Sequence, residues 1–129
     1  MLTLHDLDAR FRIMDKFPDI LEVLTVTIPP LERVADPVAA VELARVSNDE
    51  MAELVFRYPD RFVAAVANLP MNNMEAALIE TDRAIKELKF RGVQIYTNVN
   101  GEPLDLPKFK PLYEKMAYYN LSILIHPDR

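Results

Sequence analysis

The sequence predicts an α/β fold in which four parallel strands alternate with helices. Short runs of apolar and β-branched residues alternate with longer segments that carry apolar residues at helical spacing, a pattern typical of a parallel sheet covered by helices. The last three predicted strands begin roughly 30 residues apart, which is the size of a βαβ unit. The final run, residues 121–126, ends in His126 and is stopped by Pro127, which predicts a polar side chain at the carboxyl end of a strand.

Capping residues and apolar density predict the first elements. Asp6 can cap a helix over residues 6–17, whose apolar residues are mostly at helical spacing. Residues 20–26 are dense in Ile, Leu and Val and predict a strand, which a pair of prolines ends. We expect residues 31–35 to form a loop.

The middle of the chain is predicted to hold the longest helix, a strand and a second helix. The long helix begins at Asp36, a capping residue that is followed by proline in the first turn, and ends near Tyr58. Residues 61–68 have a continuous apolar body and predict a strand. Residues 72–89 form the next helix, whose start resembles a capping box with Asn in place of Ser or Thr.

The last elements are a strand over residues 92–96, a helix over 108–120 and the strand over 121–126. The loop before the helix contains Asn100-Gly101, which could form a hairpin turn, although the flanking pattern suits a βα loop better. Parallel strands are normally covered on both faces, so we expect the strand side chains to be buried. The residues to which this expectation applies are Val63, Val66, Val93, Ile95, Ile123 and Ile125.

We expect residues 1–129 to form a single partial domain. Four parallel strands can make a small doubly wound sheet, or they can be half of a (β/α)₈ barrel, which typically needs about 250 residues. The chain opens with a helix that has no preceding strand, and it closes on a strand that no helix covers. Both features favour part of a barrel.

Composition narrows the classes of protein. Twenty acidic and fifteen basic residues give a net charge of -5 without a basic patch, so we expect no nucleic-acid partner. There is no cysteine, and two glycines are too few for a phosphate-binding loop. The first residues do not resemble a signal peptide, and no apolar run approaches the roughly 20 residues of a membrane span. We therefore expect a cytoplasmic protein with no membrane contact.

Several motifs in order along the chain carry a family resemblance. They are DRFVAAVANLP at residues 60–70, FRGVQI at 90–95, NVNG at 98–101, PLYE at 111–114 and IHP at 125–127. The set resembles the amidohydrolase-related family, and within it the aminocarboxymuconate-semialdehyde decarboxylase branch, which includes resorcylate-type decarboxylases. The resemblance covers nearly the whole chain, whereas each motif alone is weakly specific.

The resemblance implies a metal-dependent (β/α)₈ barrel of which this chain contains strands two to five. In that family the ligands are a His-x-His pair after the first strand, a His after the fifth and an Asp after the eighth, and a His after the sixth takes part in the chemistry. His126 falls on the fifth-strand ligand. The sequence has no counterpart of the other groups, so we expect no activity from these residues alone. The implied cofactor is a divalent metal, zinc or manganese, which this chain alone need not bind.

The candidate site residues follow strands. From the sequence alone, His126 is more simply a strand-end histidine bonded to a loop, whereas the resemblance favours a metal ligand. Asn68, Tyr96 and Asn98 lie at or beyond strand ends and could line a substrate pocket, although amide side chains there also form turns. His5, the other histidine, is more simply a solvated residue.

Two classes of function are compatible with these observations. The resemblance implies an enzyme fragment, a decarboxylase (carboxy-lyase) of small aromatic or ring-opened carboxylates, or otherwise a hydrolase. The alternative is a non-catalytic α/β module that self-associates. A half-barrel would expose an apolar face and unpaired strand edges, so we expect a homo-oligomer closed about a two-fold axis. Helices folded onto the open face would instead give a doubly wound monomer.

Overall fold

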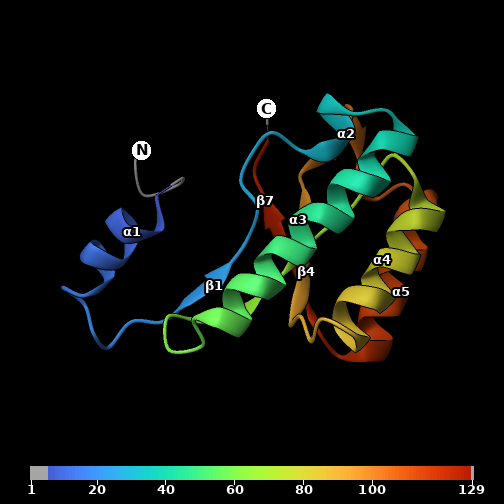
Figure 1. Ribbon diagram of the computed structural model, residues 1–129. Coiled ribbons are helices and arrows are strands. Elements are labelled where there is room, and N and C mark those ends of the chain that lie inside the picture. The colour runs from blue at the N-terminus through green and yellow to red at the C-terminus, as the bar shows by residue number, and fades with distance from the viewer. Residues whose placement is uncertain (1–5, 129) are drawn as a thin grey trace.

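The computed structural model describes residues 6–128 of the chain (Figure 1). In chain order the elements are α1 (Leu7–Met14), β1 (Glu22–Leu24), α2 (Leu31–Val34), α3 (Pro37–Arg57), β2 (Phe62–Ala65), β3 (Ala67–Asn68), α4 (Met74–Lys86), β4 (Gly92–Tyr96), β5 (Asn98–Val99), β6 (Glu102–Pro103), the 3₁₀ helix η2 (Pro107–Phe109), α5 (Lys110–Tyr119) and β7 (Ser122–His126). No helix within this part of the chain is long and apolar enough to span a bilayer.

The main strands are parallel, and their order in space follows their order in the chain. β1 pairs with β2, and β3, β4 and β7 form a second parallel set in that order. β2 and β3 are parts of one run interrupted at Val66, whose N–H donates to Leu24 O at 3.0 Å and so extends the pairing with β1. The four strands thus lie in sequential parallel order, as in a (β/α)₈ barrel.

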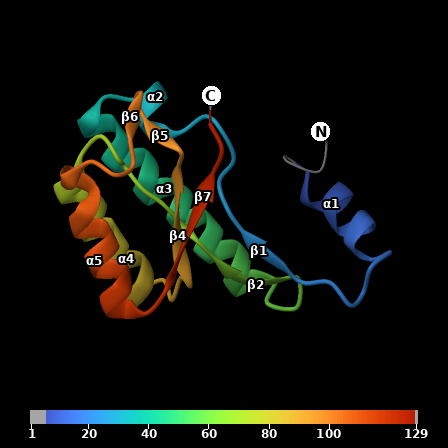
Figure 2. The ribbon, with the colours of Figure 1, turned by 180° about the vertical axis from the view of Figure 1, so that it is seen from behind.

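The helices α3, α4 and α5 lie on one side of the sheet. In the reverse view β4 and β7 lie in front of α3, and β1 lies beside them (Figure 2). Val93 and Ile95 of β4 share a core with Ala77 of α4 and with Leu112 and Met116 of α5. One face of β4 is therefore covered by helices, while its other face is on the side of a barrel interior. The predicted four parallel strands alternating with helices are confirmed.

Capping side chains begin α1 and α3 at the predicted places. Asp6 accepts a hydrogen bond from Ala9 N, and Asp36 Oδ1 accepts from the first N–H groups of α3. These bonds satisfy amides that have no partner inside the helix. α4 is capped by Asn73, which accepts from Ala76 N. This cap lies one residue after Asn72, where the predicted capping box began.

Two local predictions are wrong. Residues expected to form a loop contain the short helix α2, because Leu31 is buried against Ala40 and Ala44 of α3. The Asn100-Gly101 pair does form a hairpin turn, between the antiparallel strands β5 and β6. Both turn residues have positive φ, 51° and 84°, which the two-residue hairpin turn requires and which Asn and Gly tolerate.

Burial differs among the strand residues that were expected to be covered. Ile95 is 1% exposed and Val93 is likewise buried, while Val66 and Ile123 are half-buried. The prediction is wrong for Val63, which is 55% exposed, and for Ile125, which is 52% exposed. Val63 is exposed because it lines an open hollow between α3 and the turn before β4. Ile125 is exposed because, within residues 6–128, β7 has a strand neighbour on one side only.

Candidate functional site

The carboxyl ends of β4 and β7 bring two predicted site residues together. Tyr96 and His126 are register partners in adjacent parallel strands, and their ring centroids lie 5.5 Å apart. Register partners point to the same face of a sheet, and so does Gln94, two residues before Tyr96. Val93 and Ile95 alternate with these residues and face the helices. The pair and Gln94 therefore lie on the face that would line the interior of a barrel.

The two ring nitrogens of His126 differ in their hydrogen bonding. Its Nδ1 lies 2.8 Å from the carbonyl oxygen of Pro127. Because a carbonyl only accepts hydrogen bonds, Nδ1–H is the donor, and Nε2 is the ring nitrogen that can offer a lone pair to a metal. A backbone partner of this kind fixes the tautomer and orientation that a histidine ligand needs.

Tyr96 is 2% exposed, and its hydroxyl lies in a small hydrogen-bonded group. Gln94 Nε2 donates to the Tyr96 oxygen at 3.2 Å, and the hydroxyl donates to Val26 O at 3.4 Å. Burial raises the pKa of Tyr96, and the charges of Glu32 and Asp128 raise it further, while the hydrogen bond from Gln94 lowers it. The phenol is neutral near pH 7.

The two predicted asparagines have other partners. Asn68 is buried, and its backbone N and O pair with the side chain of Asn48 on α3 at 2.8 and 2.9 Å. Its own Nδ2 lies 3.5 Å from Ser47 Oγ on the same helix. Asn98 Oδ1 accepts from Gly101 N at 2.9 Å and stabilises the hairpin turn. These bonds tie both residues to α3 and to the turn rather than to the Tyr96–His126 pair.

Sequence reasoning missed two buried polar side chains near this pair. Gln94, 3% exposed, donates from Nε2 to Val26 O at 2.7 Å, and a glutamine inside an otherwise apolar strand could have signalled it. Glu32 on α2 is 5% exposed, and its burial raises the pKa of its carboxyl. An ion pair between Arg33 and Asp128 ties α2 to the segment after β7.

The metal-ligand set is incomplete in the described part of the chain. Within residues 6–128 no group of three or more His, Asp or Glu residues is placed to hold a metal ion. A catalytic zinc site usually has about three protein ligands. Nε2 of His126 has the donor chemistry of one ligand, and a metal bound there would need others from elsewhere.

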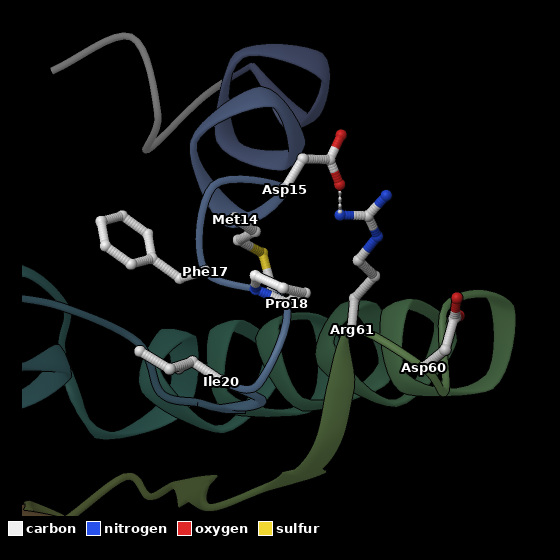
Figure 3. A pocket seen from close by; sticks show the side chains of 7 residues that line it. All are labelled: Met14, Asp15, Phe17, Pro18, Ile20, Asp60 and Arg61. Atoms are coloured by element: carbon white, nitrogen blue, oxygen red, sulfur yellow. Dashed lines mark hydrogen bonds and ion pairs between the residues drawn. The ribbon is translucent and has the colours of Figure 1, made fainter.

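A pocket of about 200 Å³ lies at the opposite end of the strands (Figure 3). It is lined by Met14, Asp15, Phe17, Pro18, Ile20, Asp60 and Arg61. The side chains of Asp15 and Arg61 form an ion pair across it, which satisfies both charges. Because these residues precede β1 and β2, the pocket is at the amino ends of the strands, whereas barrel enzymes have their sites at the carboxyl ends.

Sequential parallel strands with helices on one side and polar groups at their carboxyl ends define part of a (β/α)₈ barrel. Residues 4–128 match the sequence model of the family described as Amidohydrolase. The chain belongs to this family, and the resemblance inferred from the motifs is confirmed.

Curated relatives are decarboxylases. The chain is 35% identical over 123 residues to 2-amino-3-carboxymuconate-6-semialdehyde decarboxylase of Dictyostelium discoideum. This alignment covers 95% of this chain and 34% of that protein. It is 39% identical over 112 residues to gamma-resorcylate decarboxylase of a Polaromonas species. That alignment covers 87% of this chain and 33% of the relative. The chain thus spans about a third of the length of these relatives.

Solved structures show the same fold. The crystal structure of 2,6-dihydroxybenzoate decarboxylase from Rhizobium has a TM-score of 0.85 at 30% identity, over 95% of this chain and 39% of that one. A dihydroxybenzoic acid decarboxylase from Polaromonas has a TM-score of 0.84 at 31% identity, over 95% and 38%. The latter structure holds manganese and the inhibitor 2-nitroresorcinol. The predicted barrel class is confirmed, and a divalent metal is present in a relative.

Proposed function

We propose that this chain supplies four strands of a metal-dependent decarboxylase that acts on small aromatic or ring-opened carboxylates. The observation that carries the proposal is His126, which ends β7 beside Tyr96 with its Nε2 lone pair available. The decarboxylases among the relatives support the reaction class, and C–N or C–O hydrolysis is the second choice within the family.

The residues of the chain have distinct roles in this proposal. His126 binds the metal through Nε2, and its bond to Pro127 O keeps the ring oriented. Tyr96 packs beside the imidazole and forms a wall of the substrate site. Asn68 and Asn98 shape the loops around that site through their bonds to α3 and to the hairpin turn. A divalent metal in such a site orients the substrate and stabilises developing negative charge.

The metal in the proposal is manganese or zinc. Imidazole nitrogen is a ligand for both ions, so His126 by itself does not select between them. Manganese is the ion named in the Polaromonas structure, which supports it as the first choice for loading. The substrate is a small carboxylate because the named substrates of the relatives are of that class.

The test is product analysis on the full-length protein in which these residues occur, loaded with manganese. We expect release of CO₂ from 2,6-dihydroxybenzoate and a loss of more than about 100-fold in kcat/KM in His126→Ala. His5→Ala, whose position lies outside the residues that the structure describes, is the matched control and should keep its activity. Because residues 6–128 lack a complete ligand set, the 129 residues alone should release no CO₂. Full activity of His126→Ala would contradict the proposal.

One observation favours the alternative of a self-associating, non-catalytic module. Val23 of β1 and Leu124 and Ile125 of β7 are exposed apolar side chains on strands, where a partner could cover them. We propose a homo-oligomer in either case, with small ligands as its other partners. Light scattering at micromolar concentration should show more than one copy. A protein that binds no metal and turns over no carboxylate would favour the module.

A further inference from the structure

Gln94 has an unusual hydrogen-bonding state for a buried side chain. It lies in the middle of β4, whose five residues are all buried. Within residues 6–128, its Oε1 is one of three buried side-chain oxygens or nitrogens without a hydrogen-bond partner. An unpaired buried acceptor destabilises a fold, and an apolar side chain of the same size would avoid that loss. The glutamine at this position therefore leaves one acceptor unpaired, and its contribution lies in the two hydrogen bonds that its Nε2 donates.

The orientation of the amide is fixed by its partners. Val26 O lies 2.7 Å from Nε2, and a carbonyl can only accept, so the nitrogen faces Val26 and the oxygen is the unpaired end. The same Nε2 donates to the hydroxyl oxygen of Tyr96 at 3.2 Å. Gln94 thus links the carboxyl end of β1 to the Tyr96 hydroxyl, which belongs to the candidate site.

These contacts leave the Tyr96 proton weakly held. The hydroxyl donates to Val26 O across 3.4 Å, a long contact compared with the 2.7 Å bond that Gln94 makes to the same oxygen. If the hydroxyl turns toward another acceptor, Val26 O keeps its bond from Gln94. The hydrogen bond that Tyr96 receives also polarises its O–H group and makes it a stronger donor.

We propose that Gln94 is a positioning residue that prepares the Tyr96 hydroxyl to donate a hydrogen bond to an oxygen of the bound substrate. The substrate oxygen belongs to a carboxylate or a ring hydroxylate held beside His126, the register partner of Tyr96. The inference rests on the proposed function for its substrate, but the link between Gln94 and Tyr96 does not. Gln94 acts through Tyr96 and does not touch the substrate.

The test compares Gln94→Met, Tyr96→Phe and the double variant in the full-length protein loaded with manganese. Met keeps the length of the side chain and removes both amide groups. We expect Gln94→Met to lose about tenfold in kcat/KM for 2,6-dihydroxybenzoate. It should also unfold at a somewhat lower temperature, because Val26 O keeps only the 3.4 Å contact to Tyr96. In the Tyr96→Phe background the same substitution should cause no further loss, because the group it prepares is gone.

A second readout reports the link without catalysis. The probe is 2-nitroresorcinol, the inhibitor named in the Polaromonas structure, and its affinity should fall by the same factor in Gln94→Met and in Tyr96→Phe. Thr81→Val is the control, because Thr81 is a buried residue of α4 that donates to Ala77 O of the same helix. It should leave both the affinity for the inhibitor and kcat/KM unchanged.

The outcomes separate the two proposals. A wild-type protein that releases no CO₂ would refute the proposed function, and the affinity for 2-nitroresorcinol would still test Gln94. An unchanged affinity for this inhibitor in Gln94→Met would overturn the inference. An equal loss of activity from Gln94→Met with Tyr96 and with Phe at position 96 would also overturn it. A loss of kcat/KM in Thr81→Val as large as that in Gln94→Met would likewise overturn it, because lost stability would then explain both.

Discussion

The strands β4 and β7 are neighbours in one parallel sheet, have five residues each and differ sharply in burial. Every residue of β4 is buried, whereas no residue of β7 is. β4 is paired on both sides and covered by α4 and α5, while in residues 6–128 β7 is paired with β4 alone. Sequence pattern therefore predicts that a segment is a strand, and its neighbours decide how much of it is buried.

The largest effect is expected at Ile95, in the centre of the β4 core. Ile95→Ala removes a side chain packed between the sheet and the helices and should lower the free energy of unfolding by about 2–4 kcal/mol. Urea unfolding followed by circular dichroism measures it. A loss below about 0.5 kcal/mol would mean that β4 is not the covered strand of the pair.

A smaller loss is expected at Gly92, where the backbone of β4 lies close to that of β7. A Cβ added at Gly92 would lie 2.6 Å from the backbone oxygen of Ser122, so Gly92→Ala must push the two strands apart. Overpacking of this kind typically lowers stability by about 1–3 kcal/mol. Gly101→Ala is a useful contrast. Among residues 6–128, apart from its two chain neighbours, no atom lies within 4 Å of the added Cβ, so the effect comes from a φ of 84°. Neutral behaviour of Gly92→Ala in thermal unfolding would show that the two strands are not held this closely.

Glu32 should make stability depend on pH near the carboxyl ends of β4 and β7. Its charge interacts with Tyr96, the last residue of β4, and with Asp128, which follows β7. Burial, and to a lesser extent the charge of Asp128, raises the pKa of Glu32 above 4.5 in the folded state. The folded state thus binds this proton more tightly than the unfolded chain, so the contribution to stability is lost as pH rises through the folded pKa. Glu32→Gln should match the wild type at pH 4 and be more stable at pH 8. Equal stability of the two at both pH values would contradict the account.

The smallest effect is expected at Ile125, the β7 counterpart of Ile95 in the strand register. Its side chain is half exposed, so Ile125→Ala should lower the free energy of unfolding by less than about 1 kcal/mol. The same urea experiment gives the value. A loss as large as that of Ile95→Ala would show that β7 is covered in solution, as association of copies would produce.

The sequence predicted the elements well because their signals are local. Asp6 and Asp36 cap the helices that they were expected to begin, and the strand over residues 92–96 has the predicted bounds. The exposed positions Val63 and Ile125 were missed because an apolar side chain shows only that burial is favourable, and not whether a neighbour is present. The helix α2 was missed because its stability comes from packing of Leu31 against α3.

The candidate site was predicted only in part, for a similar reason. His126 and Tyr96 were found as the last residues of apolar runs, and the register of β4 and β7 places them side by side. The bonds of Asn68 to α3 and the link from Gln94 to Val26 join residues 20 and 68 positions apart. Such long-range bonds have no period or spacing in the sequence, so only the structure shows them.

The most direct test of the proposed function is the affinity of the full-length protein for manganese, measured by calorimetry on the wild type, His126→Ala and His5→Ala. The account predicts a loss of more than about 100-fold in His126→Ala, since the imidazole at the end of β7 is a direct ligand, and no change in His5→Ala. Equal manganese affinity in the wild type and in His126→Ala would contradict it.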